Sequence, residues 1–154
     1  MKLSHYLLSD QIIENLEAQS KKGVLEELAG VLVRKDSELD YEELVSILLE
    51  REKLGSTGIG RGVAIPHGKV KDIDSLAMAF GRSAEGIEFQ SIDGKPVHLF
   101  FLLIAPENSA GIHLKALARI TRMFKNEETK ERFMAATSAD EIYRIIVERD
   151  EEEG

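Results

Sequence analysis

The chain contains no cysteine and no tryptophan among its 154 residues. Without cysteine there is no disulfide, thiolate zinc site or cysteine nucleophile, so any metal site would rest on His, Asp or Glu. No apolar run approaches the ~20 residues that span a bilayer. The N-terminal MKLSHYLLSDQ has too short an apolar stretch for a signal peptide. We therefore expect a cytoplasmic protein without direct membrane insertion.

An excess of basic residues is also missing. The 28 Asp and Glu residues outnumber the 20 Lys and Arg residues, which gives a net charge of −8. This balance, with no basic patch laced with aromatic residues, argues against nucleic acid as a partner. The length and a hydrophobic fraction of 43% predict a single domain over residues 1–150. The acidic C-terminal residues 151–154 are expected to form a frayed tail.

Apolar residues spaced three and four apart predict amphipathic helices. These helices are expected over residues 21–35, 41–53, 113–124, 127–135 and 139–149. The second opens with a capping pattern of Asp40 and Glu43 and should end near Leu54 and Gly55. In the last, Ser138 and Glu141 form a capping box.

Three apolar segments predict strands over residues 63–65, 76–81 and 97–105. The third, within PVHLFFLLIA, is apolar almost throughout, so it should be buried on both faces of its sheet. Helices must then cover both sides. The order of the elements predicts an α/β or α+β layered domain with a mixed sheet.

The stretch GSTGIGRGVAIPHGKV, residues 55–70, packs four glycines into its first eight positions. The frame of a phosphate-binding P-loop is present, but Arg61 and Gly62 stand where its lysine and hydroxyl residue belong. The segment also runs from a helix toward a strand, the reverse of a P-loop. A dinucleotide fingerprint fails as well, since Val63 and Ile65 occupy the required glycine positions. A sharply turning backbone remains.

His67 stands between Pro66 and Gly68 at the expected end of a short strand. Pro66 restricts the backbone and Gly68 leaves the imidazole uncrowded. A neutral imidazole can attack through one nitrogen while a hydrogen bond holds the other. The residues alone leave two alternatives open, a nucleophile and a structural histidine.

Two other histidines and one arginine differ in their settings. His98 lies within the apolar strand, where a hydrogen-bonded core or edge histidine is expected. His113 falls where a loop passes into a helix, and free amides at a helix N-terminus favour an anion. Arg51 ends the helix ahead of the glycines, where it either complements the helix dipole or reaches a phosphate.

The stretch REKLGSTGIGRGVAIPHGKV closely resembles the active-site segment of the enzyme IIA domains, type 2, of the bacterial phosphoenolpyruvate-dependent phosphotransferase system. Within the fructose, mannitol and nitrogen class, it looks most like the nitrogen-regulatory members. The resemblance implies an α/β sandwich, a mixed central sheet between helices. It also implies a site loop containing Gly55, Ser56, Thr57, Gly58, Gly60, Pro66 and Gly68.

The resemblance further implies that His67 accepts a phosphoryl group at Nε2 from HPr or a nitrogen-branch analogue. His113 and Arg51, matched by their HL and REK contexts, would stabilise the transferring group. No metal or other cofactor is implied. Downstream partners would be a IIB protein or a regulatory target such as a potassium transporter or sensor kinase.

Four functions follow as hypotheses. A phosphohistidine relay that works as a regulator is favoured, because the relay site is expected on a chain without IIB, IIC or carrier segments. The first alternative is a sugar-transport IIA that passes its phosphate to a separate IIB protein for fructose or mannitol. The second is a binding module that acts only through its surface. A metal-dependent hydrolase is the weakest, because His67 and His113 lack a ligand spacing and an associated carboxylate.

Overall fold

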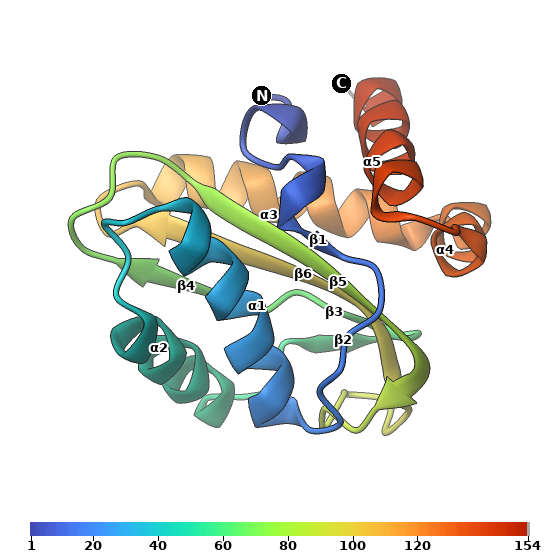
Figure 1. Ribbon diagram of the computed structural model, residues 1–154, viewed down its shortest axis with the longest axis horizontal. Coiled ribbons are helices and arrows are strands. Elements are labelled where there is room, and N and C mark those ends of the chain that lie inside the picture. Colours follow the sequence, from blue (N-terminus) through green and yellow to red (C-terminus); the bar gives the residue numbers. More distant parts are fainter. Residues whose placement is uncertain (154) are drawn as a thin grey trace.

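The computed structural model describes residues 1–153, which form five α-helices and one six-stranded sheet (Figure 1). Two short 3₁₀ helices, η1 and η2, precede the first strand. The elements are η1 (Leu3–His5), η2 (Ser9–Gln11), β1 (Ile12–Ile13), α1 (Lys21–Lys35), α2 (Tyr41–Lys53), β2 (Gly58–Gly60), β3 (Val63–Ala64), β4 (His67–Val70), β5 (Ala77–Ile87), β6 (Val97–Pro106), α3 (Ala110–Lys125), α4 (Glu127–Ala135) and α5 (Ala139–Glu153).

The apolar strand β6 is the centre of a mixed sheet. The strands of the sheet follow the order β1-β5-β6-β3-β2, and β4 also pairs with β6. β5 runs antiparallel to β6, whereas β3 and β4 run parallel to it. The predicted mixed sheet is therefore confirmed, with a buried strand between both kinds of neighbour.

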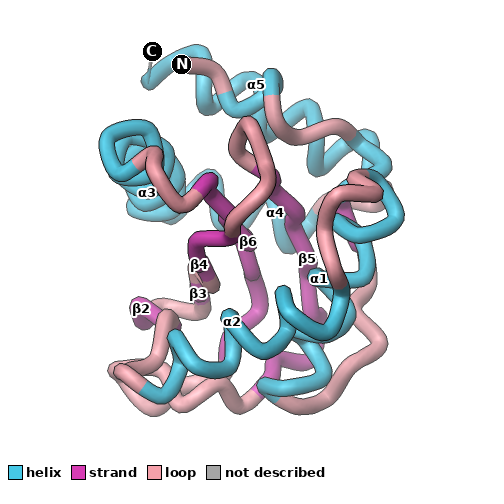
Figure 2. Tube along the Cα trace, turned by 90° about the vertical axis from the view of Figure 1, so that its left-hand side faces the viewer, coloured by secondary structure: helices cyan, strands magenta, loops and turns pink. Residues whose placement is uncertain are grey.

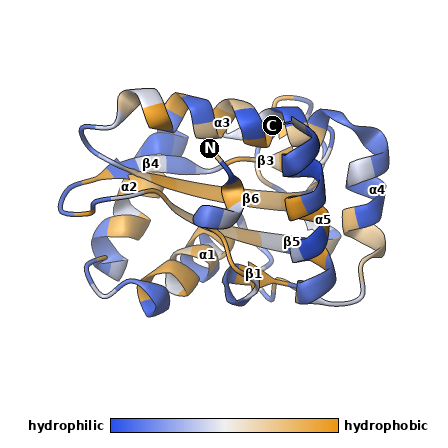
Figure 3. Ribbon diagram, turned by 90° about the horizontal axis from the view of Figure 1, so that it is seen from above, coloured by the Kyte–Doolittle hydropathy of each residue, from blue (hydrophilic) through white to orange (hydrophobic). Residues whose placement is uncertain are grey.

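Helices cover both faces of this sheet, as the continuous apolar run predicts. Phe100, Leu102 and Ile104 of β6 pack into one core with α1 and α2. The alternate residues of β6 pack into a second core with α3, α4 and α5. Figures 2 and 3 show the two groups of helices on opposite sides of the strands. Within residues 1–153, no helix has the length and apolar character needed to cross a membrane.

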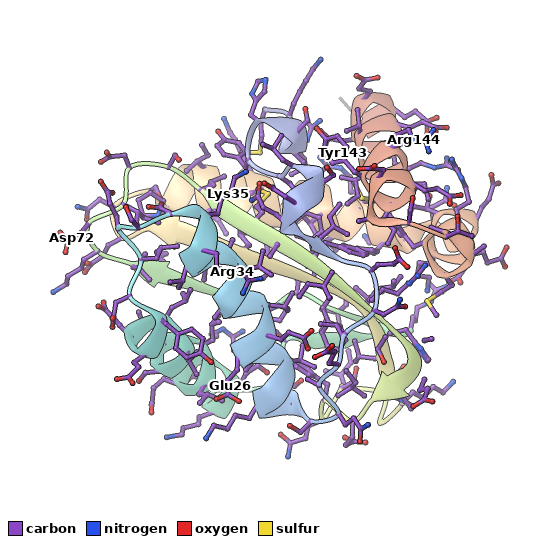
Figure 4. The ribbon with its side chains drawn as sticks, in the orientation of Figure 1. Glu26, Arg34, Lys35, Asp72, Tyr143 and Arg144 are labelled. Atoms are coloured by element: carbon purple, nitrogen blue, oxygen red, sulfur yellow. The ribbon has the colours of Figure 1, made fainter. Side chains whose placement is uncertain are left out.

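Side-chain caps explain where several helices begin. Ser20, Asp40 and Asn126 each accept a hydrogen bond from a backbone N–H three residues later, at the starts of α1, α2 and α4. These three helices have the bounds that the periodicity predicts. On α1 the polar residues Glu26 and Arg34 turn away from the sheet (Figure 4), as amphipathic packing requires.

Other predicted bounds were wrong by several residues. α3 begins at Ala110 rather than at residue 113, and β5 continues to Ile87 rather than ending at residue 81. The glycine loop itself contains the short strand β2, which pairs with β3. α5 reaches Glu153, so the helix continues into the predicted tail, of which residue 154 lies outside the described residues.

The strand expected over residues 63–65 is one residue shorter, and a second strand follows it. β3 ends at Ala64 and β4 begins at His67, and both pair with β6 in the same register. Between them the carbonyl of Pro66 accepts the backbone N–H of Leu103. His67 therefore begins a strand instead of standing at the end of one.

Gly68 allows β4 to approach α2 closely. A Cβ at this position would lie 2.8 Å from Cγ2 of Ile47, nearer than side chains normally pack. Gly68 is therefore required by packing beside His67 and not by a turn.

We expect Gly68→Ala to lower the free energy of unfolding by about 1–3 kcal/mol, because the added methyl group overpacks the contact with Ile47. Urea denaturation measures the change. Gly111→Ala is the matched control, since a Cβ there meets nothing within 4 Å. Equal stability of the two variants would contradict the close approach.

Candidate active site

A cavity of about 640 Å³ lies beside β4, between α2 and α3. Figure 2 shows this side of the molecule, with β4 between the two helices. Its lining combines two histidines, an arginine, a lysine and a glutamate with apolar side chains. The lining residues are Ile47, Glu50, Arg51, Leu54, His67, Gly68, Lys69, Ala110, His113, Leu114 and Leu117.

The backbone just before β4 orients His67. Its Nδ1 lies 2.8 Å from the carbonyl oxygen of Ile65. A carbonyl only accepts, so Nδ1 carries the proton and donates it, which leaves the lone pair of a neutral ring on Nε2. The half-buried ring lines the cavity. It therefore presents an unprotonated nitrogen there.

His113 meets His67 edge to face. The ring centroids are 5.5 Å apart and the ring planes are 88° apart. His113 is only 7% exposed, and its Nδ1 is buried without a hydrogen-bond partner among the described residues. A proton on Nδ1 would be an unsatisfied buried donor, so the neutral ring keeps its proton on Nε2. His113 can then donate to an anion beside His67.

Two cationic side chains complete the lining. Arg51, in the last turn of α2, donates from Nη1 to the carbonyl oxygen of Gly55 at 2.9 Å. A guanidinium has five N–H donors, so this contact leaves others for an anion. Lys69 is exposed and follows His67 by two residues in β4, so both side chains leave the same face of the strand.

The N-terminus of α3 adds backbone donors. Ser109 precedes the helix but donates its hydroxyl to the Pro106 carbonyl, and no side chain caps the first turn. That turn contains no acidic residue, and Ala110 lines the cavity. Free amides and the positive end of the helix dipole therefore border the histidine pair.

Residues 5–149 match the family model described as "Phosphoenolpyruvate-dependent sugar phosphotransferase system, EIIA 2". The chain belongs to this enzyme IIA family. A nitrogen regulatory protein of Bradyrhizobium diazoefficiens is 40% identical over 149 residues, which cover 95% of each chain. The fructose-specific EIIABC component of Bacillus subtilis is 37% identical over 150 residues. The match covers 97% of this chain but 24% of that longer protein.

A solved structure supports the same relationship for this enzyme IIA chain. The nitrogen regulatory protein IIA-Ntr of Neisseria meningitidis superposes with a TM-score of 0.88 at 39% identity, covering 94% of this chain and 98% of that one. IIA mannitol of Escherichia coli gives a TM-score of 0.77 at 26% identity, with 91% and 98% coverage. The predicted enzyme IIA sandwich is confirmed.

Burial lowers the pKa of both histidines at the cavity of this enzyme IIA chain, which favours their neutral forms. Burial is the main cause that lowers the pKa of His67, and the nearby Arg51 lowers it further, against the raising effects of the Ile65 hydrogen bond and Glu52. Burial also lowers the pKa of His113, with added repulsion from His67 and Lys69. A neutral His67 is the form that can attack an electrophile.

The structure brings Arg51, His67, Gly68 and His113 together at the cavity. The other predicted loop residues are outside its lining. Ser56 donates to the Phe89 carbonyl, Thr57 is buried against Glu52, and Gly58 packs against Ser91. Gly55 and Gly60 have positive φ angles and form turns. His98, bonded through Nδ1 to the Ser83 carbonyl, is the hydrogen-bonded histidine expected.

Sequence reasoning missed Lys69 and Glu52. For Lys69 the signal would have been a strand prediction over residues 67–70, because alternate residues of a strand share a face and Lys69 would then lie on the face of His67. Glu52 had none, since a glutamate at the end of an amphipathic helix is usually exposed. Within residues 1–153, no group of three or more His, Cys, Asp or Glu side chains is placed to hold a metal ion.

We expect His67 to titrate below the ordinary histidine value of about 6.5 and to carry its proton on Nδ1 when neutral. The neutral form is then lost only as the pH falls through that lowered value. Nitrogen-15 NMR of the imidazole measures both properties. A midpoint at or above 6.5, or a proton on Nε2, would contradict the geometry.

Proposed function

We propose that this enzyme IIA chain is a phosphohistidine relay protein in which Nε2 of His67 accepts a phosphoryl group from an HPr-like carrier. The observation that carries the proposal is the hydrogen bond from Nδ1 of His67 to the Ile65 carbonyl, which leaves Nε2 free beside the cavity. The chain would act as a phosphotransferase component, without conventional turnover of a small molecule.

Atoms and charges balance in the transfer step without a metal. The Nε2 lone pair of His67 forms a bond to phosphorus as the bond between phosphorus and the imidazole of the carrier's phosphohistidine breaks. The donor ring, protonated on its other nitrogen, leaves as neutral imidazole. The positive charge passes to the His67 ring, where the Ile65 carbonyl accepts from Nδ1–H and stabilises it.

The residues around Nε2 supply the electrostatic part of catalysis. Phosphoryl transfer depends mainly on positioning and on neutralising the oxygens of the transferring group. Arg51, Lys69, the Nε2–H of His113 and the first turn of α3 are the proposed donors. They lie in one lining, so they can meet that group without a large rearrangement.

Exposed apolar side chains at the rim of the cavity suit a docking carrier. Leu54 is 85% exposed on the α2 side and Leu114 is 66% exposed on the α3 side. Both also line the cavity. Covering them would remove apolar surface from water and exclude water from the transfer.

A regulatory role is the favoured context for this relay. It is supported by the 40% identity to a nitrogen regulatory protein over nearly the full length of both chains. The second candidate is a sugar-transport IIA, supported by the 37% identity to part of a fructose-specific EIIABC component. Loss of uptake of one sugar in a deletion strain would favour this second candidate.

We expect the wild-type chain to gain acid-labile phosphate when incubated with phosphoenolpyruvate, enzyme I and a carrier. His67→Ala should gain none, because the nucleophile is gone. His113→Ala should still gain it at a rate lower by roughly 10²-fold, a usual cost for removing one preorganised donor. Radiolabelled phosphate retained on the protein measures both results.

Two outcomes would contradict the relay. Wild-type protein that gains no phosphate excludes it, and labelled His67→Ala protein excludes His67 as the acceptor. Complementation of every deletion phenotype by His67→Ala would favour a binding module instead.

We expect Lys69→Gln to slow phosphorylation roughly tenfold, because a charge-assisted contact to the phosphoryl group is lost. Lys69→Arg should retain most of the rate, since it keeps the charge. Lys71→Gln is the matched control, an exposed lysine two residues on and outside this cavity. Equal rates for the two Gln variants would remove Lys69 from the site.

A further inference from the structure

Glu52 is a buried carboxylate bonded to the glycine loop and lies outside the lining of the site cavity. It is 9% exposed. Its Oε1 accepts the backbone N–H of Thr57 at 3.1 Å and lies 3.0 Å from Nζ of Lys21. Its Oε2 accepts the hydroxyl of Thr57. The carboxylate therefore connects the end of α2 to the glycine loop and to the start of α1. The end of α2 and the start of α1 lie side by side in Figure 1.

Hydrogen bonds continue from Thr57 to the imidazole. The carbonyl of Thr57 accepts the backbone N–H of Ile65 at 3.0 Å. The carbonyl of Ile65 in turn accepts Nδ1–H of His67 at 2.8 Å. Three consecutive contacts thus connect a buried charge to the nitrogen opposite the proposed nucleophile.

We propose that Glu52 and Thr57 are positioning residues that set the tautomer and ring orientation of His67. Ile65 precedes a proline, so its backbone is already restricted, and the bond to Thr57 holds its position. The Ile65 carbonyl then faces Nδ1 only while Thr57 is held by Glu52. This inference rests on the proposed function for its consequence, but its geometric part concerns the unphosphorylated protein.

Lys21 is the ion-pair partner of Glu52. Its ammonium lies 4.9 Å from the centre of the Phe89 ring and donates to the Gln90 side chain at 3.2 Å. These contacts hold Nζ beside the buried carboxylate. The charged groups acting on His67 are Arg51 and Glu52 from α2. Glu50, Lys69 and His113 line the same cavity.

Nitrogen-15 NMR of the unphosphorylated protein tests the geometry in Glu52→Ala and Thr57→Val. We expect the fraction of neutral His67 with its proton on Nδ1 to fall in both. Glu52→Gln should retain that tautomer, since an amide can accept from Thr57 N and bond its hydroxyl. It should also lower the pKa of His67 further, because the negative charge that raises it is gone. Glu42→Gln, an exposed position on the same helix, is the control.

Phosphorylation rates test the consequence. We expect Glu52→Ala and Thr57→Val to slow phosphorylation by tenfold or more, with Glu52→Gln closer to wild type. Circular dichroism identifies any variant that fails to fold. If Glu52→Ala does not fold, Thr57→Val tests the contact between the Thr57 hydroxyl and Glu52, because it removes the hydroxyl and keeps the backbone N–H.

The outcomes separate the inference from the relay itself. An unchanged tautomer in a folded Glu52→Ala protein overturns the positioning role, whatever the phosphorylation result. An unchanged tautomer in Thr57→Val overturns the role of the Thr57 hydroxyl. If the tautomer changes in the variants but wild-type protein gains no phosphate, the positioning role of Glu52 and Thr57 stands and the proposed relay is contradicted. A changed tautomer with an unchanged rate shows that the orientation does not serve the transfer, and overturns that part of the inference.

Discussion

The hydrogen bond between Nδ1 of His67 and the Ile65 carbonyl depends on the side of the strand to which that carbonyl points. β3 and β4 pair with β6 in one register, and between them the carbonyl of Pro66 accepts the backbone N–H of Leu103 at 2.9 Å. Successive carbonyls of an extended strand point to opposite sides, so the Ile65 carbonyl points away from β6. It is therefore not used in the ladder with β6 and can accept from an imidazole. The edge of this strand opposite β6 thus supplies the orienting contact of the site.

Close packing of two helices around β4 makes a site from this contact. α2 approaches the strand where Gly68 has no side chain, and α3 brings His113 to the other side of the cavity. Both helices are anchored by cores on opposite faces of the sheet. The histidine pair is therefore held between two separately packed layers, which limits its freedom without metal or covalent links.

The sequence predicted what depends on periodicity and missed what depends on tertiary contacts. Helices over 21–35 and 127–135 follow from apolar spacing and capping residues, and their bounds are confirmed. The predicted start of α3 is too late, because Ala110 and Gly111 carry no apolar pattern. The predicted end of β5 is too early, because the residues after Gly81 are polar and do not show the apolar pattern of a strand. Arg82 is buried there by bonds to the carbonyls of Glu14, Phe133 and Ala136.

The candidate site shows the same difference between what the sequence predicts and what tertiary contacts decide. The resemblance named His67, His113 and Arg51, and the structure brings these three to one cavity. Neither the tautomer of His67 nor the burial of Glu52 could be read from the sequence. Each depends on a contact that forms only when the glycine loop closes on α2 and β3. Gly55, Gly60 and Gly62 permit the turns, because each has a positive φ angle.

Local charge outweighs net charge at the cavity. A chain of net charge −8 would repel a phosphoryl dianion if all its charges acted on the anion regardless of distance. At physiological ionic strength, however, exposed charges separated by more than about 8 Å are largely screened. Arg51, Lys69 and the first turn of α3 line the same cavity as His67. Glu50 in that lining is paired with Lys53, and the buried Glu52 is paired with Lys21. An acidic protein can therefore hold an anion site where the nearby carboxylates have their own cations.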